Sequence, residues 1–375
     1  MQSLVYRNGE LTLDSFAEPK PDAYQILVQT IACGICGSDL HFVEHSEELA
    51  DQVQLVSNYG EIPGGTINLE QDIFMGHEFS AKILEIGADA DVVQGQKVKP
   101  GDTLVSLPVL ISGSKISQLA YSNDCYGGFA QQLLVSNSFC FKVPEDLDSI
   151  LASLTEPMAV GLHAVNLSKC DSDTPVLVLG LGPVGISIIA ALKNRNVNKI
   201  IGVDFSQFRR DLAILFGADV ALDPSKDDVF AEFKKYVSFK RPVIFEAVGL
   251  PGILNDVMLK SPLNSKVVVV GVCMQNDSII PFYGIAKELE VVFSFAYNFN
   301  EFKDSLYSLI PIQDHLRKLV TSEFLIDNAT EAFELLKSQA QNNTAQNNTA
   351  QNNNVRAQIP DNKQAEQCKV LIRFS

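Results

Sequence analysis

The 375-residue sequence predicts an α/β protein with two domains, one mostly β and one built on a doubly wound parallel sheet of six strands. The length is one reason, because 375 residues exceed what a single hydrophobic core usually holds. The second reason is a change of pattern near Pro175. Short apolar runs between Gly, Pro and Asp precede it, and β-branched runs alternating with helical patterns follow it.

The first region, up to about residue 150, is expected to form short strands. Runs such as "QILVQTIAC", "SAKILEIGA" and "FAQQLLVS" are apolar or alternating and end at turn residues. A long polar segment, 44–72, interrupts this pattern. It forms either a surface excursion with a short helix at 47–56 or part of the substrate entrance, and the sequence leaves both interpretations open.

The second region predicts strands at 176–179, 199–203, 219–222, 243–247, 266–270 and 290–295. Helices are expected between them at 183–194, 208–216, 228–237, 251–260 and 283–287. Such alternation is typical of a parallel sheet that is covered by helices on both faces.

The alternation stops after residue 297, where helices are expected at 301–309 and 329–337. The repeat "QAQNNTAQNNTAQNNNVRAQ" is too polar to bury a core, so 338–367 is predicted to be a low-complexity insertion. The closing "KVLIRFS" is strand-like again. We therefore assign 1–160 and 298–375 to the first domain and 161–297 to the second.

Composition limits the partners. A net charge of -16 opposes binding to nucleic acid or to an anionic membrane, which favours a small-molecule ligand.

The seven cysteines are odd in number and scattered, which predicts reduced thiols in the cytoplasm. The first sixteen residues lack an apolar core, so no secretion signal is expected. The uncharged stretch 175–192 has central Gly and Pro residues, which favour a strand, turn and helix over a membrane span.

The stretch "VLVLGLGPVG" predicts a dinucleotide site at the turn between the first parallel strand and its helix. Gly180 permits the tight turn, Gly182 allows a pyrophosphate to approach, and Gly185 lets helix and strand pack closely. The helix that opens at Pro183 and Val184 would bind the phosphates at its N-terminus.

Asp204 ends the next strand, "KIIGVD". A carboxylate there accepts hydrogen bonds from the ribose hydroxyls and repels a 2'-phosphate, so NAD is expected rather than NADP. Arg209 weakens this expectation slightly, and Arg210 is expected on a solvated helix face.

The stretch "CGICGSDLH" allows a redox pair, half of a structural zinc site or one side of a metal-centred active site. Downstream lie His77 and Glu78 in "MGHEFS" and Glu156 in "LTEPMAVGLHA". A thiolate, Cys36, together with an imidazole and a carboxylate from separate segments favours a catalytic zinc with one open position. A redox pair should open a helix, whereas Cys33 and Cys36 follow a strand, so Cys33 is interpreted as a buried thiol.

The landmarks "GICGSDLH", "GHEFSAKILEIG", "EPMAVGLHA", "GLGPVG" and "EAVG" with "VVVVGV" resemble, in order, those of zinc-dependent medium-chain dehydrogenases/reductases that act on alcohols and polyols. The resemblance implies a GroES-like, mostly β catalytic domain and a Rossmann domain. It implies reversible hydride transfer between NAD and an alcohol, diol, polyol or sugar.

The resemblance also implies roles for individual residues. Cys36 and His77 would be zinc ligands, with Glu78 or Glu156 as the carboxylate. Ser38 would pass the alcohol proton through the cofactor ribose to His41, and Asp39 would orient His77. A homodimer or homotetramer is expected, with strand 290–295 as a pairing edge.

The sequence departs from the family in the long stretch between His41 and His77 and in the region 102–128. Many members hold a second, structural zinc with four close cysteines, but 102–128 contains only Cys125, so one catalytic zinc is expected. The same residues disfavour two rival functions. A zinc-free quinone or enone reductase has no use for the metal-ligand set, and a non-enzymatic dinucleotide-binding protein has no use for the proton relay.

Overall fold

A computed structural model describes residues 1–60, 66–339 and 366–374. The chain divides into two compact units. The first unit comprises Met1–Glu156, Phe302–Lys337 and the strand at the C-terminus, and the second contains Pro157–Glu301 with residues 338–339 and 366–368. Most of the predicted insertion, 340–365, lies outside the described residues.

The first unit is mostly β, as predicted, and its main sheet has seven strands. Six follow the order β12-β8-β5-β3-β20-β19, and β11 also pairs with β3. Their bounds are β3 Gln25–Gly34, β5 Glu78–Ile86, β8 Thr103–Ser106, β11 Gln132–Ser136, β12 Cys140–Lys142, β19 Val320–Leu325 and β20 Lys369–Arg373. The predicted C-terminal strand is therefore confirmed as β20.

Smaller sheets complete this unit. One has the order β2-β1-β4, with bounds β1 Gln2–Arg7, β2 Glu10–Ser15 and β4 Ile73–Phe74. Two-stranded sheets are formed by β6 Val92–Val93 with β7 Gln96–Lys97, and by β9 Val109–Ser112 with β10 Lys115–Gln118. Fully buried side chains such as Leu4, Ile26 and Phe129 fill the core between these strands.

The end of β3 pairs with two other strands of the main sheet. Gly34, the last residue of β3, pairs with Glu78 at the start of β5 and with Leu371 in the middle of β20. Residues far apart in the sequence are thus brought to one place by strand register.

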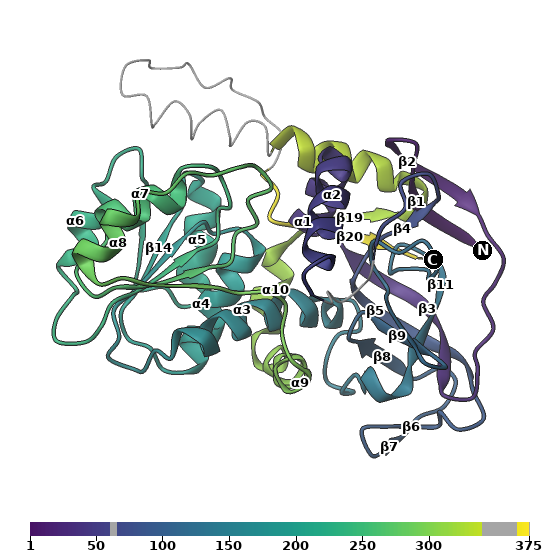
Figure 1. Cartoon of the computed structure of the whole chain (residues 1–375). Helices are drawn as coiled ribbons and strands as arrows, with labels where there is room; N and C mark the ends of the chain where they lie inside the picture. The colour runs from purple at the N-terminus through teal and green to yellow at the C-terminus, as the bar shows by residue number, and fades with distance from the viewer. Residues whose placement is uncertain (61–65, 340–365, 375) are drawn as a thin grey trace. The chain divides into compact units, whose positions relative to one another are not determined.

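The second unit contains the predicted parallel sheet, of which β14 is labelled in Figure 1. The sheet has six strands, in the order β15-β14-β13-β16-β17-β18. The bounds are β13 Val176–Leu179, β14 Ile200–Val203, β15 Val220–Leu222, β16 Val243–Glu246, β17 Lys266–Val269 and β18 Glu290–Phe293. The order reverses direction between β13 and β16, which is where doubly wound sheets bind ligands.

The helices of this unit follow the predicted alternation. They are α3 Thr155–Ser168, which begins in the first unit, then α4 Pro183–Asn194, α5 Gln207–Phe216, α6 Val229–Lys234, α7 Ile253–Lys260, α8 Pro281–Lys287 and α9 Phe299–Ser308, which ends in the first unit. α4 contacts α5, and α7 contacts α8. The chain moves from β13 toward β15 in one direction and from β16 toward β18 in the other. Because such crossovers are right-handed, α4 and α5 lie on one face of the sheet, and α7 and α8 lie on the opposite face.

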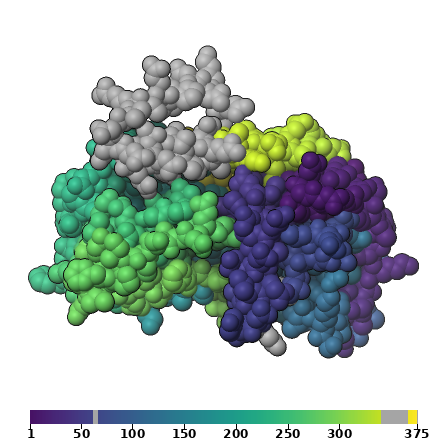
Figure 2. Space-filling model, turned by 45° about the horizontal axis from the view of Figure 1, so that its top comes forward, coloured from purple at the N-terminus to yellow at the C-terminus, as the bar shows by residue number. Residues whose placement is uncertain are grey.

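The first unit also contains helices. α10 spans Gln313–Leu319, and a further helix covers 329–339. α2, Ser46–Ser57, matches the predicted helix closely, whereas α1, Gly37–Glu44, was not predicted. Figure 2 shows that α1 and α2 lie on the surface of the unit. Among the described residues, no helix is both long enough and apolar enough to cross a membrane.

Candidate functional site

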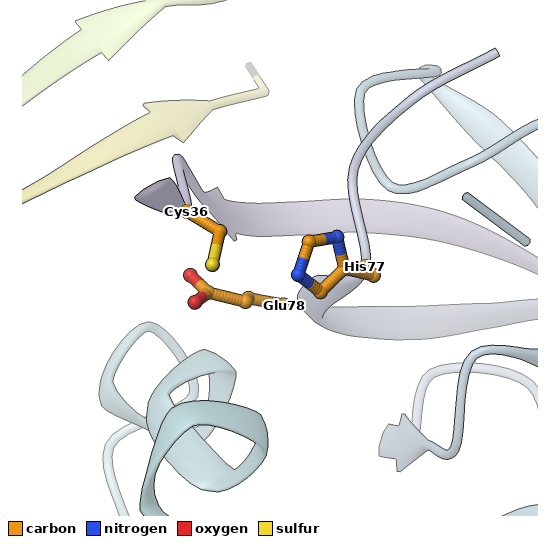
Figure 3. A group of neighbouring side chains, drawn as sticks. All are labelled: Cys36, His77 and Glu78. Carbon is orange, nitrogen blue, oxygen red and sulfur yellow. The ribbon is translucent and has the colours of Figure 1, made fainter. Parts of the chain in front are cut away.

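Cys36, His77 and Glu78 converge in the first unit (Figure 3). Cys36 lies between β3 and α1, His77 precedes β5, and Glu78 opens β5. One potential ligand atom from each residue lies within 4.8 Å of the other two. Within the described ranges, no other group of three His, Cys, Asp or Glu side chains is close enough to hold a metal ion.

Two glycines make this convergence possible. A Cβ atom on Gly34 would lie 2.1 Å from Glu78 Oε2 and 2.7 Å from Lys369 Cε. Gly76 adopts a φ of 90° in the turn before His77, and a Cβ there would lie 2.6 Å from Phe129 N. Glycine is therefore required at both positions. Gly34 is needed because a side chain would not fit, and Gly76 is needed both for space and for its positive φ.

Lys369 is the unexpected member of the site. Its side chain is 1% exposed, and its ammonium group forms an ion pair with the equally buried Glu78 carboxylate. Lys369 Nζ also donates a hydrogen bond to Ile35 O at 3.0 Å. Burial is the largest single effect and lowers the pKa of Lys369, but the charges of Glu78, Cys36 and Glu156 and the hydrogen bond to Glu78 together raise this pKa above its usual value. The lysine is thus held charged beside the carboxylate.

Asp39 links two of the converging residues. Its Oδ2 accepts a hydrogen bond from Cys36 N at 2.9 Å, and its Oδ1 lies 3.8 Å from His77 Nδ1. His77 Nδ1 therefore faces Asp39, which leaves Nε2 for a metal ion. The carboxylate is placed to hold the ring in this orientation.

Tyr121 lies beside these groups. Its hydroxyl oxygen is 2.9 Å from Ser38 Oγ and 3.0 Å from Asp39 Oδ1, both within hydrogen-bonding distance. Burial and the charge of Asp39 raise the pKa of Tyr121 well above its usual range, so the side chain stays a neutral phenol. No motif in the sequence pointed to Tyr121.

Cys33 does not belong to the converging group. It lies on β3 with 0% exposure, and a Cβ on Gly128 would be 2.7 Å from its sulfur. Cys33 lies within β3, and Cys36 directly precedes α1, so the preceding strand does not by itself exclude a redox pair. Burial of Cys33 in the core, which raises the pKa of its thiol well above the usual value, is the better reason against a redox pair.

Glu156 and His41 lie outside the group of three. Glu156 is buried at the start of α3, and its charge contributes to the raised pKa of Lys369. His41 is half-buried on α1. Burial and the charge of His45 lower the pKa of His41, which favours its neutral form.

The converging side chains suit zinc. Zinc binds sulfur at about 2.3 Å and nitrogen or oxygen at about 2.0–2.2 Å, which keeps tetrahedral ligand atoms about 3.5 Å apart. Ligand atoms that already lie within 4.8 Å reach this spacing through small side-chain rotations. Thiolate, imidazole and carboxylate are all zinc ligands, and three protein ligands leave one position open, as in catalytic sites.

The glycine turn of the second unit joins β13 to α4. Gly180 has a φ of 87°, and a Cβ on Gly185 would lie 1.9 Å from Gly180 O. A Cβ on Gly182 would meet no atom within 4 Å, so the backbone there is open to a ligand. Pro183 and Val184 form the first turn of α4, whose free N–H groups favour an anion.

Asp204 follows β14 beside this turn. Its carboxylate accepts hydrogen bonds from Leu181 N and Ser206 N, each at 2.9 Å. Arg209 Nη1 lies 3.8 Å from Asp204 Oδ2. Arg210 is buried and donates hydrogen bonds to Asp204 O and Phe205 O, both at 2.7 Å, so the expectation of a solvated Arg210 was wrong.

Comparison with known proteins identifies the family. Residues 22–145 match the alcohol dehydrogenase GroES-like domain, and residues 183–310 match the zinc-binding dehydrogenase domain. The chain is 30% identical to the (R,R)-butanediol dehydrogenase of Bacillus subtilis, over 87% of this chain and 92% of the relative. The chain belongs to the zinc-type medium-chain alcohol dehydrogenase family. It is accordingly an enzyme that acts on CH–OH donors, and the predicted GroES-like and Rossmann fold is confirmed.

Two further comparisons agree with this assignment. Human sorbitol dehydrogenase is 24% identical to this alcohol dehydrogenase, over 89% of this chain and 92% of the relative. The crystal structure of 2R,3R-butanediol dehydrogenase from Bacillus subtilis superimposes with a TM-score of 0.75 and 26% identity, covering 99% of both chains. The likeness therefore extends over both units of the dehydrogenase.

Proposed function

We propose that this alcohol dehydrogenase uses NAD and one zinc ion to oxidise a secondary alcohol, diol or polyol reversibly. The observation that carries the proposal is the convergence of Cys36, His77 and Glu78, with ligand atoms within 4.8 Å of one another. The names of the relatives, butanediol and sorbitol dehydrogenases, support a diol or polyol as the substrate class.

When bound, zinc supplies a Lewis acid that lowers the pKa of the alcohol, and NAD supplies the hydride acceptor. The chain's own residues handle the proton. Ser38, half-buried at the start of α1, accepts the proton of the alcohol. His41, one turn further along α1, has a lowered pKa and is therefore neutral, so that it accepts the proton passed on from Ser38 and then releases it to solvent.

Cys36 and His77 would hold the zinc ion, and the third ligand is Glu78 or Glu156. The position of Glu78 in the converging group favours Glu78 as the ligand. Its ion pair with Lys369 argues the other way, because the negative charge of Glu78 is already neutralised. Matched variants distinguish these candidates. We expect E78Q to lower zinc affinity measured by chelator competition more than E156Q does, and the reverse order would identify Glu156 as the ligand.

Asp204 supports the choice of NAD. Its carboxylate lies at the carboxyl end of β14, beside the open backbone at Gly182, where a 2'-phosphate would be repelled. We expect a higher kcat/KM with NAD than with NADP. D204A should lower the ratio of kcat/KM with NAD to kcat/KM with NADP, because Arg209 would then lie beside the site without the opposing carboxylate.

The activity itself is tested by following NADH formation with a panel of secondary alcohols, diols, polyols and sugars. We expect turnover of at least one diol or polyol, and loss of both zinc and turnover in C36A. Retained turnover by zinc-free C36A would contradict the proposed mechanism.

We propose, in addition, that the protein forms a homodimer through β18. This strand lies at the edge of the six-stranded sheet; Phe293, its last residue, is 72% exposed, and Phe295, two residues further on, is 77% exposed. Ile285 and Phe282 on α8 are also exposed. A second copy could pair with this edge about a two-fold axis and cover the apolar side chains. Light scattering should show a dimer for the wild type and a monomer for F293K/F295K.

The cytoplasm is the proposed location. All seven cysteines are free thiols, which suits a reducing compartment. The single cysteine near the β9–β10 hairpin, Cys125, supports the absence of a structural zinc in that region. Cell fractionation and a zinc-to-protein ratio of one test these two points.

A further inference from the structure

Tyr121 occupies a strained backbone conformation at the edge of the site. Its φ is 54°, in the left-handed region that bulky side chains rarely adopt. Such strain is commonly found at functional sites, where the surrounding structure maintains it. The strain is therefore a reason to ask what the Tyr121 side chain does.

The phenol ring is fixed by aromatic packing. It stacks on Phe42 of α1 with a centroid distance of 4.9 Å and an interplanar angle of 25°. Phe42 in turn packs edge-on against Tyr6 of β1 at 5.3 Å, and Tyr6 is hydrogen-bonded to Ser46 Oγ at 2.7 Å. The ring thus cannot turn without disturbing three elements, so its hydroxyl is held in one place.

The hydrogen bonds of this hydroxyl have a defined direction. Asp39 Oδ2 accepts from Cys36 N, and Oδ1 faces both His77 Nδ1 and the Tyr121 hydroxyl. The Tyr121 hydroxyl is the donor in both contacts and shares its one hydrogen between Ser38 Oγ and Asp39 Oδ1. One lone pair of Ser38 Oγ is thereby engaged, and its second lone pair and its own hydrogen remain for the alcohol and for the next group of the proton relay.

We propose that Tyr121 is a positioning residue that orients the Ser38 hydroxyl to receive the alcohol proton and ties it to Asp39. This inference rests on the proposed function, because it assigns Ser38 to proton transfer. Without the phenol oxygen, the Ser38 hydroxyl rotates among its rotamers, and only part of the population presents a lone pair correctly. The cost of losing one such hydrogen bond corresponds to a decrease in kcat of about tenfold.

The test compares Y121F with Y126F. Y121F keeps the ring on Phe42 and removes only the oxygen. Tyr126 is a matched control because it lies on the same segment, packs its ring on Phe74 at 4.7 Å and donates its hydroxyl to Ala17 O at 3.0 Å, away from Ser38. We expect Y121F to lower kcat about tenfold with KM for the alcohol within about twofold, and Y126F to match the wild type.

Two further measurements separate positioning from packing. In an S38A background, Y121F should cause no additional loss of kcat, since the two residues act together. The zinc content of Y121F should equal that of the wild type. The proposal would be overturned if Y121F lowered kcat equally in the wild-type and S38A backgrounds. It would also be overturned if Y121F did not lower kcat, or if the loss of kcat followed the zinc content.

A readout without turnover keeps this inference distinct from the proposed function. The Raman doublet of the phenol, isolated as the wild type minus Y121F difference, reports the hydrogen bonds of Tyr121. We expect it to change in S38A even if no alcohol in the panel is oxidised, in which case only the proposed function would fail. An unchanged doublet in S38A would show that Tyr121 does not bond to Ser38.

Discussion

Replacing Lys369 with methionine removes the positive charge that is buried against Glu78. Both side chains are 1% exposed, so water cannot replace the lost partner. Removing one member of a buried ion pair typically costs about 3–5 kcal/mol, because the other charge remains buried and unpaired. Lys369 Nζ also donates to Ile35 O, and this acceptor would be unsatisfied as well. We therefore expect K369M to destabilise the first unit by about 3–5 kcal/mol in the absence of metal.

Lys266 provides a matched control. It is a buried lysine on β17 that pairs with Glu290 at 2.9 Å, but Glu290 is 41% exposed and keeps Arg241 as a second partner. We expect K266M to cost about 1 kcal/mol or less from the lost ion pair. The double variant K369M/E78Q should recover most of the stability lost in K369M, since the unpaired charge is then absent.

Hydrogen exchange of the backbone amides of β3 and β20 is the appropriate assay, because the two units need not unfold together. Exchange is measured with a chelator present and then with zinc, which should restore part of the protection by supplying a positive charge to Glu78. A loss in K369M no larger than that in K266M would refute the assignment of a buried, charged pair at this site.

Three other perturbations test neighbouring parts of the account. The acid limb of the pH profile of kcat/KM should lie below pH 6.5, because His41 must be neutral to accept a proton and its folded pKa is lowered from 6.5; H41Q should lack this limb. D39N should weaken zinc binding about 10- to 100-fold in chelator competition, since it removes the carboxylate that faces His77 Nδ1, and unchanged affinity would argue against that role. G185A should abolish NAD binding measured by fluorescence or unfold the second unit, because its Cβ would lie 1.9 Å from Gly180 O; normal binding would show that the turn adapts.

The parallel sheet was predictable because its strands are mainly apolar runs, interrupted only by residues such as Glu246, Lys266 and Glu290 at strand ends, and helical patterns lie between them. The strand of Val176–Leu179 and the helix of Pro183–Asn194 were predicted with the bounds found in the structure. α1 was missed because its sequence, "GSDLHFVE", begins with Gly and Ser and has no strong apolar periodicity. Its N-terminus depends on a hydrogen bond from Cys36 N to Asp39 rather than on an apolar face.

The candidate site divides in a similar way. Cys36, His77 and Glu78 were predicted because metal ligands have recognisable residue types. Lys369 was not predicted, because its pairing with Glu78 depends on β20 joining the sheet beside β3. Tyr121 was missed because its role depends on a positive φ and on aromatic stacking with Phe42, neither of which a single sequence reveals.

X-ray absorption at the zinc edge tests the central claim most directly. The account predicts one zinc per chain with a single sulfur ligand at about 2.3 Å and nitrogen or oxygen ligands at about 2.0–2.2 Å. The sulfur contribution should disappear in C36A and persist in C33A. A zinc ion surrounded by four sulfur atoms, or a sulfur signal that survives C36A, would contradict the account.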